Sequence, residues 1–471
     1  MRWLSTIAVA FSGASSQPVP FVPAFMQASA AGYQGAFPSV PGHNSACMWR
    51  AACDMAEVNV TVSNCVLWGS GVTAEVFPAD GADLNIKAVL YVPAKPYSKP
   101  TRNFTGGLAA GATNGILSAN APNSNWEYVE FSNGDWRWVK YTSASTACSW
   151  DEPLSSNVTN VARIWSFTKV GTFTFDGVTP GIFTGGQKST LQGVIAADVR
   201  SGDPTIVQFY LSKVGGGNFQ LPASQPAEAT DTISVRLKEA YINSATDNSE
   251  TMIGRAPWQA LNHGVNQFRP VSLRGRGISN TNYLEWTVLG DSNDAVTGSV
   301  VQRFMHANGI RFQNLSKAGE FGSSYLAMSS VRQQVYSGRG LLILLGENSA
   351  SLGQMQAIID HGRAAGFSKI ICGLLPPNTQ VGSIGGTAPD QSDQVANPNI
   401  RLLNNQLISL VGQPGGIDDV LDLNTPLVGV DVDKWKPNFS GDLIHLNVAA
   451  RVAGFNYLQE TNAKTKFLTP T

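Results

Sequence analysis

The stretch Thr287-Val288-Leu289-Gly290-Asp291-Ser292-Asn293-Asp294 joins an apolar run to a helical pattern. The apolar run 284–289 stops at Gly290, and apolar residues then recur four positions apart, at Val296, Val300 and Phe304. A strand that ends in a serine and turns directly into a helix holds the hydroxyl at the carboxyl edge of the sheet, where open α/β sheets bind ligands. The glycine permits the tight turn, and the start of the helix leaves N–H groups free to face an anion. The stretch therefore predicts a serine nucleophile at residue 292.

The bulk composition limits the classes of protein to consider. A chain of 471 residues is long enough for roughly two or three domains. Charged residues make up only 14% of it, below the roughly 25% typical of soluble domains. The net charge of −1 gives no electrostatic basis for binding nucleic acid or acidic membranes. The sequence also lacks a run of 18 apolar residues, so we expect no membrane span.

Residues 1–54 predict an extended N-terminal arm. Within it, 1–14 is similar to a short secretion signal, with Arg2 before an apolar run and small residues at its end. A signal that is cleaved and a segment that is retained are equally consistent with this pattern. The stretch 15–45 is rich in Pro, Ala, Ser and Gly, which favours an extended chain over a packed element. Such an arm could anchor the chain to other virion proteins or to further copies of itself, or simply lie on the next domain.

The five cysteines leave the redox state open. Four lie in the first third of the chain and allow three pairings, which an oxidising compartment would favour: Cys47, Cys53, Cys65 and Cys148. Four buried free thiols are an equally good interpretation. Cys372 stands alone in an apolar run and is expected to be inert core.

Residues 55–275 predict one or two antiparallel β-domains, sandwich-like and either carbohydrate-binding or structural. Apolar and polar residues alternate over 84–92 and again over 232–238, as in half-buried strands. The runs 126–131 and 136–139 flank Asn-Gly, and Asp176-Gly177 follows a further short run; both dipeptides favour type I′ hairpins. Trp136 and Trp138 share one face of a strand, which indicates core more often than a sugar-stacking platform.

Residues 276–471 change to strand–helix alternation. Near-continuous apolar strands are expected at 284–289, 310–315, 341–345, 369–374 and 420–423. Helical patterns centre on 352–359 and 400–410, the second opening with Asn397-Pro398, and a last helix is expected over 448–458. This order predicts an α/β/α three-layer domain with a parallel sheet covered on both faces.

Two other blocks supply the remaining parts of an acyl-transfer site. Asp442 and His445 are three apart, just before the last helix, so the carboxylate can hold the imidazole while its other nitrogen faces Ser292. The strand 341–345 runs into Gly346-Glu347-Asn348, which delivers the Asn348 amide to the same edge of the sheet as an oxyanion donor. The N–H groups of Gly319 and Ser292 are the other expected donors.

These blocks resemble, in residue type and in order, the SGNH (GDSL-type) hydrolase family: Gly290-Asp291-Ser292, Gly319, Gly346-x-Asn348 and Asp442-x-x-His445. The resemblance covers 276–471. It implies an ester hydrolase with Ser292 as nucleophile, His445 as general base and Asp442 as the orienting acid. The oxyanion hole would be formed by Ser292, Gly319 and Asn348, and no cofactor or metal would be needed. The sequence departs from the family at Asn293, where leucine is usual, and at Ser349, where aspartate is common; Gly322 lies close enough to compete with Gly319.

The resemblance implies a carbohydrate O-acetyl esterase acting on an acylated polysaccharide outside the cell, because family members with attached β-domains often remove acetyl groups from glycans. The alternative is a virion protein, such as a phage tail spike or fibre, that carries the same deacetylating domain. A binding module with an inactive site is a third reading, disfavoured by the complete set of expected site residues. Both of the first two readings place the protein outside the cell, as a secreted enzyme or on a virus particle.

Overall fold

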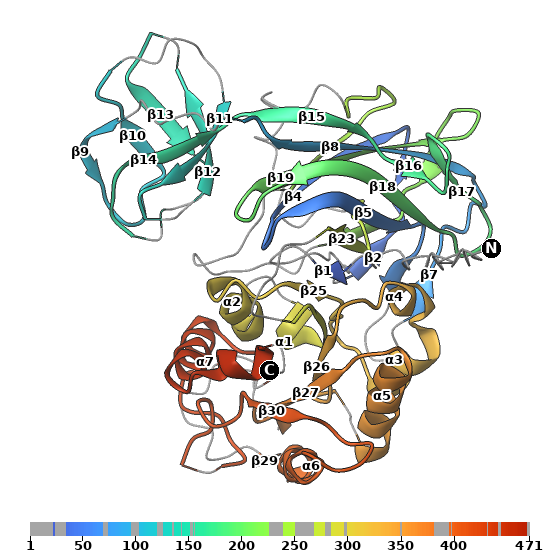
Figure 1. The fold of residues 1–471 in the computed structure, drawn as a ribbon, viewed down its shortest axis with the longest axis vertical. Coiled ribbons are helices and arrows are strands. Elements are labelled where there is room, and N and C mark those ends of the chain that lie inside the picture. Colours follow the sequence, from blue (N-terminus) through green and yellow to red (C-terminus); the bar gives the residue numbers. More distant parts are fainter. Residues whose placement is uncertain are drawn as a thin grey trace, which may run out of the picture.

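The structure is a computed structural model of the whole chain. It describes residues 22–23, 34–68, 74–95, 103–119, 126–133, 136–142, 144–150, 154, 156–225, 239–249, 268–277, 284–295, 299–348, 351–380, 395–396, 398–430, 432–440 and 444–468. Figure 1 shows three bodies: a β-sandwich, a smaller sheet that projects from one end of it, and a layered α/β region.

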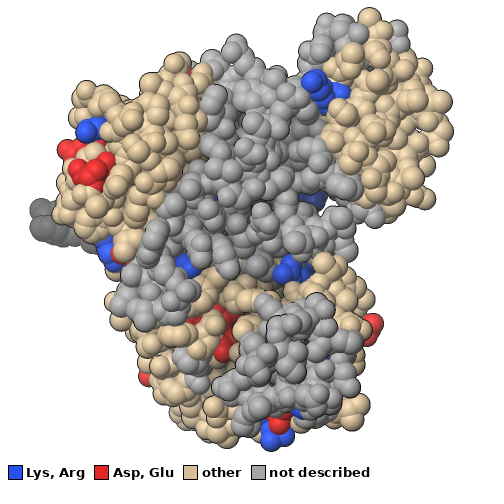
Figure 2. All heavy atoms as spheres, turned by 180° about the vertical axis from the view of Figure 1, so that it is seen from behind, with Lys and Arg blue, Asp and Glu red and all other residues tan. Residues whose placement is uncertain are grey.

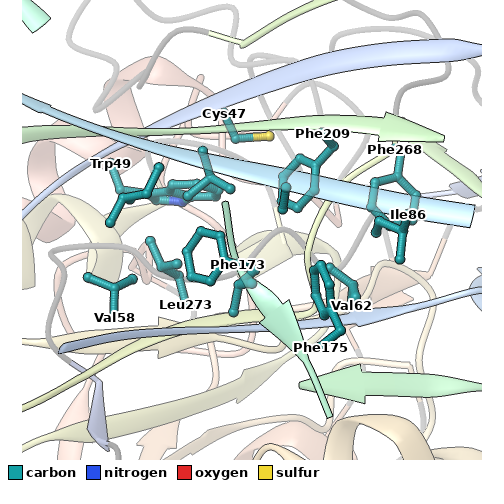
Figure 3. Packing of buried hydrophobic residues seen from close by; sticks show 14 of the residues in the cluster. Cys47, Trp49, Val58, Val62, Ile86, Phe173, Phe175, Phe209, Phe268 and Leu273 are labelled. Carbon is teal, nitrogen blue, oxygen red and sulfur yellow. The ribbon is translucent and has the colours of Figure 1, made fainter. Parts of the chain in front are cut away.

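Two antiparallel sheets form the sandwich. The first has the order β1 (Val22–Pro23), β23 (Ser272–Arg276), β5 (Met55–Ser63), β18 (Thr190–Val199) and β16 (Thr174–Phe175). The second has the order β15 (Phe167–Thr172), β8 (Leu84–Pro93), β19 (Pro204–Lys213), β4 (His43–Arg50) and β22 (Glu239–Asn243), and β17 (Gly181–Phe183) also pairs with β8. Aromatic and aliphatic side chains of both sheets meet between them, among them Phe173, Phe209 and Phe268 (Figure 3). The sandwich predicted from period-two alternation is therefore present.

Strand β4 corrects the predicted extent of the N-terminal arm. His43–Arg50 falls inside 1–54, yet it lies between β19 and β22 in the second sheet and is buried along nearly its whole length. The sequence did not reveal this strand because its first residues are polar. Asn44 and Ser45 are buried through hydrogen bonds to the carbonyl groups of Thr246 and Phe268, which alternation of apolar residues cannot signal.

The projecting sheet is inserted between β8 and β15. Its order is β10 (Asn114–Ile116), β13 (Ala147–Trp150), β12 (Trp136–Tyr141), β11 (Trp126–Phe131), β14 (Val158–Trp165) and β9 (Asn103–Leu108). The predicted hairpin is confirmed, since Glu130 pairs with Trp136 in the antiparallel β11–β12 ladder. The side chains of Trp136 and Trp138 lie outside the described residues.

The second predicted hairpin is also confirmed. Asp176 and Gly177 both have positive φ, 47° and 85°, as a type I′ turn requires. The N–H of Phe175 donates to the carbonyl of Val178 and the reverse bond is equally short, 2.8 Å in each case. The strand predicted over 232–238 lies outside the described residues.

All five cysteines are free thiols, so none of the three pairings left open by the sequence forms. Burial raises the pKa of the Cys53 thiol to about 11 and that of Cys372 to about 12. These thiols are buried core groups, as expected for Cys372.

Four short antiparallel pairs complete the strands. They are β2 (Gln34–Ala36) with β21 (Ala223–Gln225), β3 (Ser39–Val40) with β20 (Phe219–Gln220), β6 (Val66–Trp68) with β7 (Ala74–Val76), and β28 (Thr379–Gln380) with β29 (Val395–Ala396). Of these, β7 matters most for the site, because it lies against α3 (Gly322–Met328) of the α/β region.

A parallel five-stranded sheet forms the centre of the α/β region. Its order is β25 (Phe312–Asn314), β24 (Trp286–Gly290), β26 (Gly340–Leu344), β27 (Lys369–Leu374) and β30 (Asp419–Asp422). The five predicted strands are confirmed within two residues at each end. Because the chain moves outward from β24 first to one side and then to the other, the order reverses at β24. Open sheets bind ligands at such a switch point, outside the carboxyl ends of the strands.

Helices cover both faces of this sheet. They are α1 (Ser292–Ala295), α2 (Val300–Ala307), α3 (Gly322–Met328), α4 (Ser330–Gln334), α5 (Leu352–Ala364), α6 (Pro398–Ser409), α7 (Val448–Glu460) and a final 3₁₀ helix, Ala463–Phe467. One face packs against α2 and α7, and the other against α3, α5 and α6. The α/β/α layering predicted from the sequence is therefore present, and α6 begins at Pro398 as its cap signal indicated.

The sandwich and the α/β region are joined by specific polar contacts. The hydroxyl of Ser272 donates to Oε1 of Gln313 over 2.7 Å. A guanidinium nitrogen of Arg311 lies 3.9 Å from the sulfur of Cys53. In Figure 1 the strands β23 and β7 face the layer that contains β25 and α4. The two regions thus share a buried boundary.

Candidate functional site

Ser292 stands where the sequence places it, at the carboxyl end of β24. It is the first residue of α1 and is only 5% exposed. Gly290 permits this turn, because a Cβ there would come within 2.6 Å of the Asp294 Cβ and 2.9 Å of the Ser316 hydroxyl. The carbonyl of Gly290 accepts from the N–H of Lys317 over 3.0 Å. This backbone hydrogen bond therefore joins the turn after β24 to the turn after β25.

The Asp291 carboxylate binds the backbone that follows the neighbouring strand, β26. One carboxylate oxygen accepts from the N–H of Glu347 over 3.2 Å, and the other from the N–H of Asn293 over 3.4 Å. Burial raises the pKa of Asp291 to about 7, although the backbone hydrogen bonds and the charge of His445 act in the opposite direction.

The Asn293 side chain forms hydrogen bonds with the backbone of the residues before and after His445. Its Nδ2 donates to the carbonyl of Ile444 over 3.1 Å, and its Oδ1 accepts from the N–H of Leu446 over 2.9 Å. Nδ2 also contacts the Glu347 carboxylate. The residue after the proposed nucleophile thus grips the backbone around the proposed base, although 153 positions separate Asn293 from Leu446. Leucine, which is usual at this position in the family that the sequence resembles, could not make these hydrogen bonds.

His445 is half-buried in a short loop that is anchored at both ends. The hydroxyl of Ser440 donates to the His445 carbonyl over 2.8 Å. Asn447 caps α7 by accepting from the N–H of Ala450 over 3.1 Å. Asp442, the predicted orienting acid, lies outside the described residues.

The two other residues predicted to form the oxyanion hole, Gly319 and Asn348, meet at the turn after β25. Gly319 has a φ of +68°, a conformation that favours glycine, and is followed by the buried Glu320. The Asn348 Nδ2 lies 3.4 Å from the Glu320 carbonyl. Gly322 is instead the first residue of α3, so the geometry favours Gly319 as the turn glycine. The structure therefore brings the Asn348 side chain to the turn that contains Gly319.

A buried ion pair supports this turn and escaped the sequence analysis. The Arg332 guanidinium donates to both oxygens of Glu320, over 2.7 and 2.5 Å, and to the Leu315 carbonyl over 3.1 Å. Burial acts to lower the pKa of Arg332, but the charge and hydrogen bonds of Glu320, together with the charges of Tyr325 and Glu75, outweigh it and the pKa is raised. No local pattern marks this pair, because α4 carries Arg332 and the turn before α3 carries Glu320.

Asp294 and Lys317 are two further buried ionisable groups that the sequence analysis did not single out. Burial, followed by the charge of Asp291, raises the pKa of Asp294 well above its ordinary value, and Arg451 opposes this only in part. Burial lowers the pKa of Lys317 to about 8, and the Glu320 charge limits the effect. Shifted pKa values of this kind gather at functional sites.

Figure 2 views the molecule from behind Figure 1, and the described surface on that face is mostly uncharged, with acidic and basic side chains in small separate groups. This agrees with the low share of charged residues in the chain. Among the described residues, no helix is both long and apolar enough to cross a membrane.

Comparison of the sequence with protein-family models finds no match, and no curated protein matches it either. Some solved structures are similar to part of the fold. A GDSL-like lipase from Bacteroides thetaiotaomicron is 14% identical, with a TM-score of 0.29, over 38% of this chain and 88% of that one. The lipase/acylhydrolase from Enterococcus faecalis is 19% identical, with a TM-score of 0.27, over 40% of this chain and 98% of that one.

A family two carbohydrate esterase from Cellvibrio japonicus matches over a longer range. It is 8% identical, with a TM-score of 0.26, over 86% of this chain and 98% of that one. The identities and TM-scores of all three structures are low, so the assignment of the site rests on the residues of this chain.

Proposed function

We propose that the α/β region is a serine ester hydrolase of the SGNH (GDSL-type) family, with Ser292 as nucleophile and His445 as general base. Asp442 is the proposed orienting acid. The observation that supports the proposal is the pair of hydrogen bonds from the Asn293 side chain to the backbone of Ile444 and Leu446, because they tie the residue after Ser292 to both neighbours of His445. The Gly319 turn and the Asn348 amide then supply donors on the neighbouring strand ends.

The proposed reaction has two steps. The Ser292 hydroxyl attacks the ester carbonyl while His445 takes its proton, and the N–H groups of Ser292 and Gly319 with the Asn348 amide stabilise the oxyanion. Collapse of this intermediate expels the alcohol, which receives the proton from His445. Water then attacks the acyl-enzyme, with His445 again as base, and releases the acid and the free serine.

The proposed substrate is an O-acetylated polysaccharide outside the cell. This choice is supported by the resemblance of 276–471 to a family whose members with attached β-domains often deacetylate glycans, and by the large β-rich region joined to the site in this chain. Location on a secreted enzyme or on a virus particle is likewise part of the proposal, and most of the N-terminal arm on which the particle reading depends lies outside the described residues.

The direct test compares Ser292→Ala with Ser323→Ala, a matched serine substitution at an exposed position of α3. We expect Ser292→Ala to abolish acetate release from p-nitrophenyl acetate and from acetylated xylan, and Ser323→Ala to leave it unchanged. Equal turnover by wild type and Ser292→Ala would refute the assignment. Activity on the small ester without activity on any of several acetylated glycans would retain the esterase and reject the glycan.

A further inference from the structure

Glu75 reaches from the β-rich region into the α/β region. It lies in β7 and its side chain is 2% exposed. Its carboxylate accepts from the N–H groups of Val331, at 2.9 and 3.0 Å, and of Arg332, at 3.1 Å. The hydroxyl of Ser330 donates to it over 3.0 Å. A carboxylate from the β-rich region therefore serves as the acceptor for the first N–H groups of α4.

Helix α4 depends on such an acceptor. It has only five residues, and Ser329 makes no side-chain cap hydrogen bond to it. A helix this short is unstable alone, since few of its backbone groups bond within it. An anion at the N-terminus of a helix satisfies free N–H groups and complements the helix dipole. Glu75 thus fixes where α4 begins and how it is oriented.

The orientation of α4 fixes Arg332, and Arg332 fixes Glu320. The N–H of Arg332 is one of the groups bound by Glu75, while its guanidinium holds both oxygens of the Glu320 carboxylate. Arg332 and Glu320 are 2% and 1% exposed, so solvent does not compete for this pair. A shift of α4 would therefore move Glu320 or leave its charge buried without its partner.

Glu320 in turn positions two proposed oxyanion donors. It follows Gly319 in the chain, and its carbonyl lies 3.4 Å from the Asn348 Nδ2. Its side chain and its carbonyl thus tie the Gly319 turn to α4 on one side and to the end of β26 on the other.

We propose that Glu75 is a positioning residue for the oxyanion hole, acting through α4, Arg332 and Glu320, so that the β-rich region completes the catalytic site. The inference rests on the proposed function. Oxyanion donors stabilise the transition state only if they are held in place before the reaction, and small misplacements lower the rate without affecting substrate binding in proportion. We therefore expect the loss of the Glu75 contacts to lower kcat more than it changes KM.

The test uses Glu75→Gln in the full-length chain, with p-nitrophenyl acetate as substrate. The neutral amide keeps the shape but accepts less strongly from the α4 N–H groups, so we expect kcat to fall about tenfold and KM to change by less than about twofold. Glu57→Gln is the matched control. It removes the same charge from an ion pair with Arg276 within the sandwich, where one contact measures 2.8 Å, and we expect it to leave kcat unchanged.

A double-mutant cycle with Asn348→Ala separates positioning from general stability. If Glu75 acts through the oxyanion hole, Glu75→Gln should lower kcat by less than about threefold once the Asn348 amide is gone. An equal tenfold loss in both backgrounds, or a wild-type kcat in Glu75→Gln, would overturn the inference.

Ser330→Ala keeps the inference falsifiable if Glu75→Gln does not fold. Ser330 is exposed and donates one of the hydrogen bonds to Glu75, so its removal should lower kcat about two- to threefold, again only when Asn348 is present. An unchanged kcat in Ser330→Ala would then reject the inference. Wild-type turnover that persists in Ser292→Ala would instead reject the proposed function, so the two failures are distinguishable.

Discussion

The β-sandwich and the carboxyl edge of the parallel sheet both bury polar side chains, but they bury different kinds. In the sandwich, the side-chain N–H and O–H groups of Asn44, Ser45 and Asn59 donate to backbone carbonyl groups of adjacent segments, at 3.0 to 3.1 Å. At the sheet edge the buried groups include carboxylates that are bound by side chains and N–H groups from other segments: Asp291, Glu320 and Glu347.

The difference separates buried neutral groups that satisfy the fold from buried ionisable groups that surround the proposed site. A neutral hydrogen bond to a carbonyl satisfies strand ends at little net cost. Buried carboxylates are expensive unless paired, and replacing them with apolar residues is often neutral or stabilising. Their concentration around Ser292 and Asn348 is consistent with the proposed site at this edge.

Removal of the proposed base, His445, is expected to have the largest effect on kcat. We expect His445→Ala to lower kcat for p-nitrophenyl acetate by about ten-thousandfold, because no group then takes the serine proton. Steady-state kinetics measure this, with thermal unfolding as a control for folding. A decrease in kcat of less than tenfold would show that His445 is not the general base and that the carboxyl edge of the parallel sheet is not the catalytic site.

A substitution in the core of the sandwich should lower stability and leave kcat nearly unchanged. Phe209 is fully buried against Phe268, with ring centroids 5.4 Å apart. Phe209→Ala should lower the free energy of unfolding by about 3–5 kcal/mol through lost burial and the cavity it leaves. Below the unfolding temperature, kcat should stay within twofold of wild type. A large loss of kcat in folded protein would mean that the two regions do not divide their roles in this way.

The pH dependence of stability tests the cost of the buried carboxylates. The pKa of Asp291 rises from 3.8 to about 7 on folding, so the folded protein binds this proton more tightly than the unfolded chain. The resulting stabilisation is complete below the unfolded pKa and is lost as the pH rises through the folded pKa. Urea unfolding of wild type and Asp291→Asn at pH 5 and pH 8 measures it. We expect the variant to lose about 2–3 kcal/mol less than wild type between these pH values, and identical pH dependence would contradict the assignment.

The smallest expected effect concerns Asn293. Asn293→Leu restores the usual family residue but removes the grip on Ile444 and Leu446. We expect kcat to fall about tenfold with little change in KM, because the base is then less well held. Asn293→Asp should not restore kcat, since a carboxylate cannot donate to the Ile444 carbonyl and would face Glu347. Full activity in Asn293→Leu would show that the loop around His445 is held by other contacts.

The strands and helices that follow strong periodic patterns could be predicted from the sequence. The apolar run at 369–374 coincides with β27, and Pro398 begins α6. Strand β4 could not be predicted in this way, because its polar residues are buried by partners about 200 positions away, such as Thr246 for Asn44. The same holds for Glu75, whose carboxylate is bound by N–H groups of α4 about 256 positions away.

By itself, the sequence determined the order of the site blocks and the strands that carry them, because apolar periodicity and turn glycines are local properties. It placed Ser292 and Asn348 at strand ends and His445 before the last helix. Only the tertiary structure decided that Asn293 grips the His445 segment and that Glu75 caps α4 from the β-rich region. These contacts join residues far apart in the chain, and their free energy depends on burial and geometry that exist only after the sheets have packed.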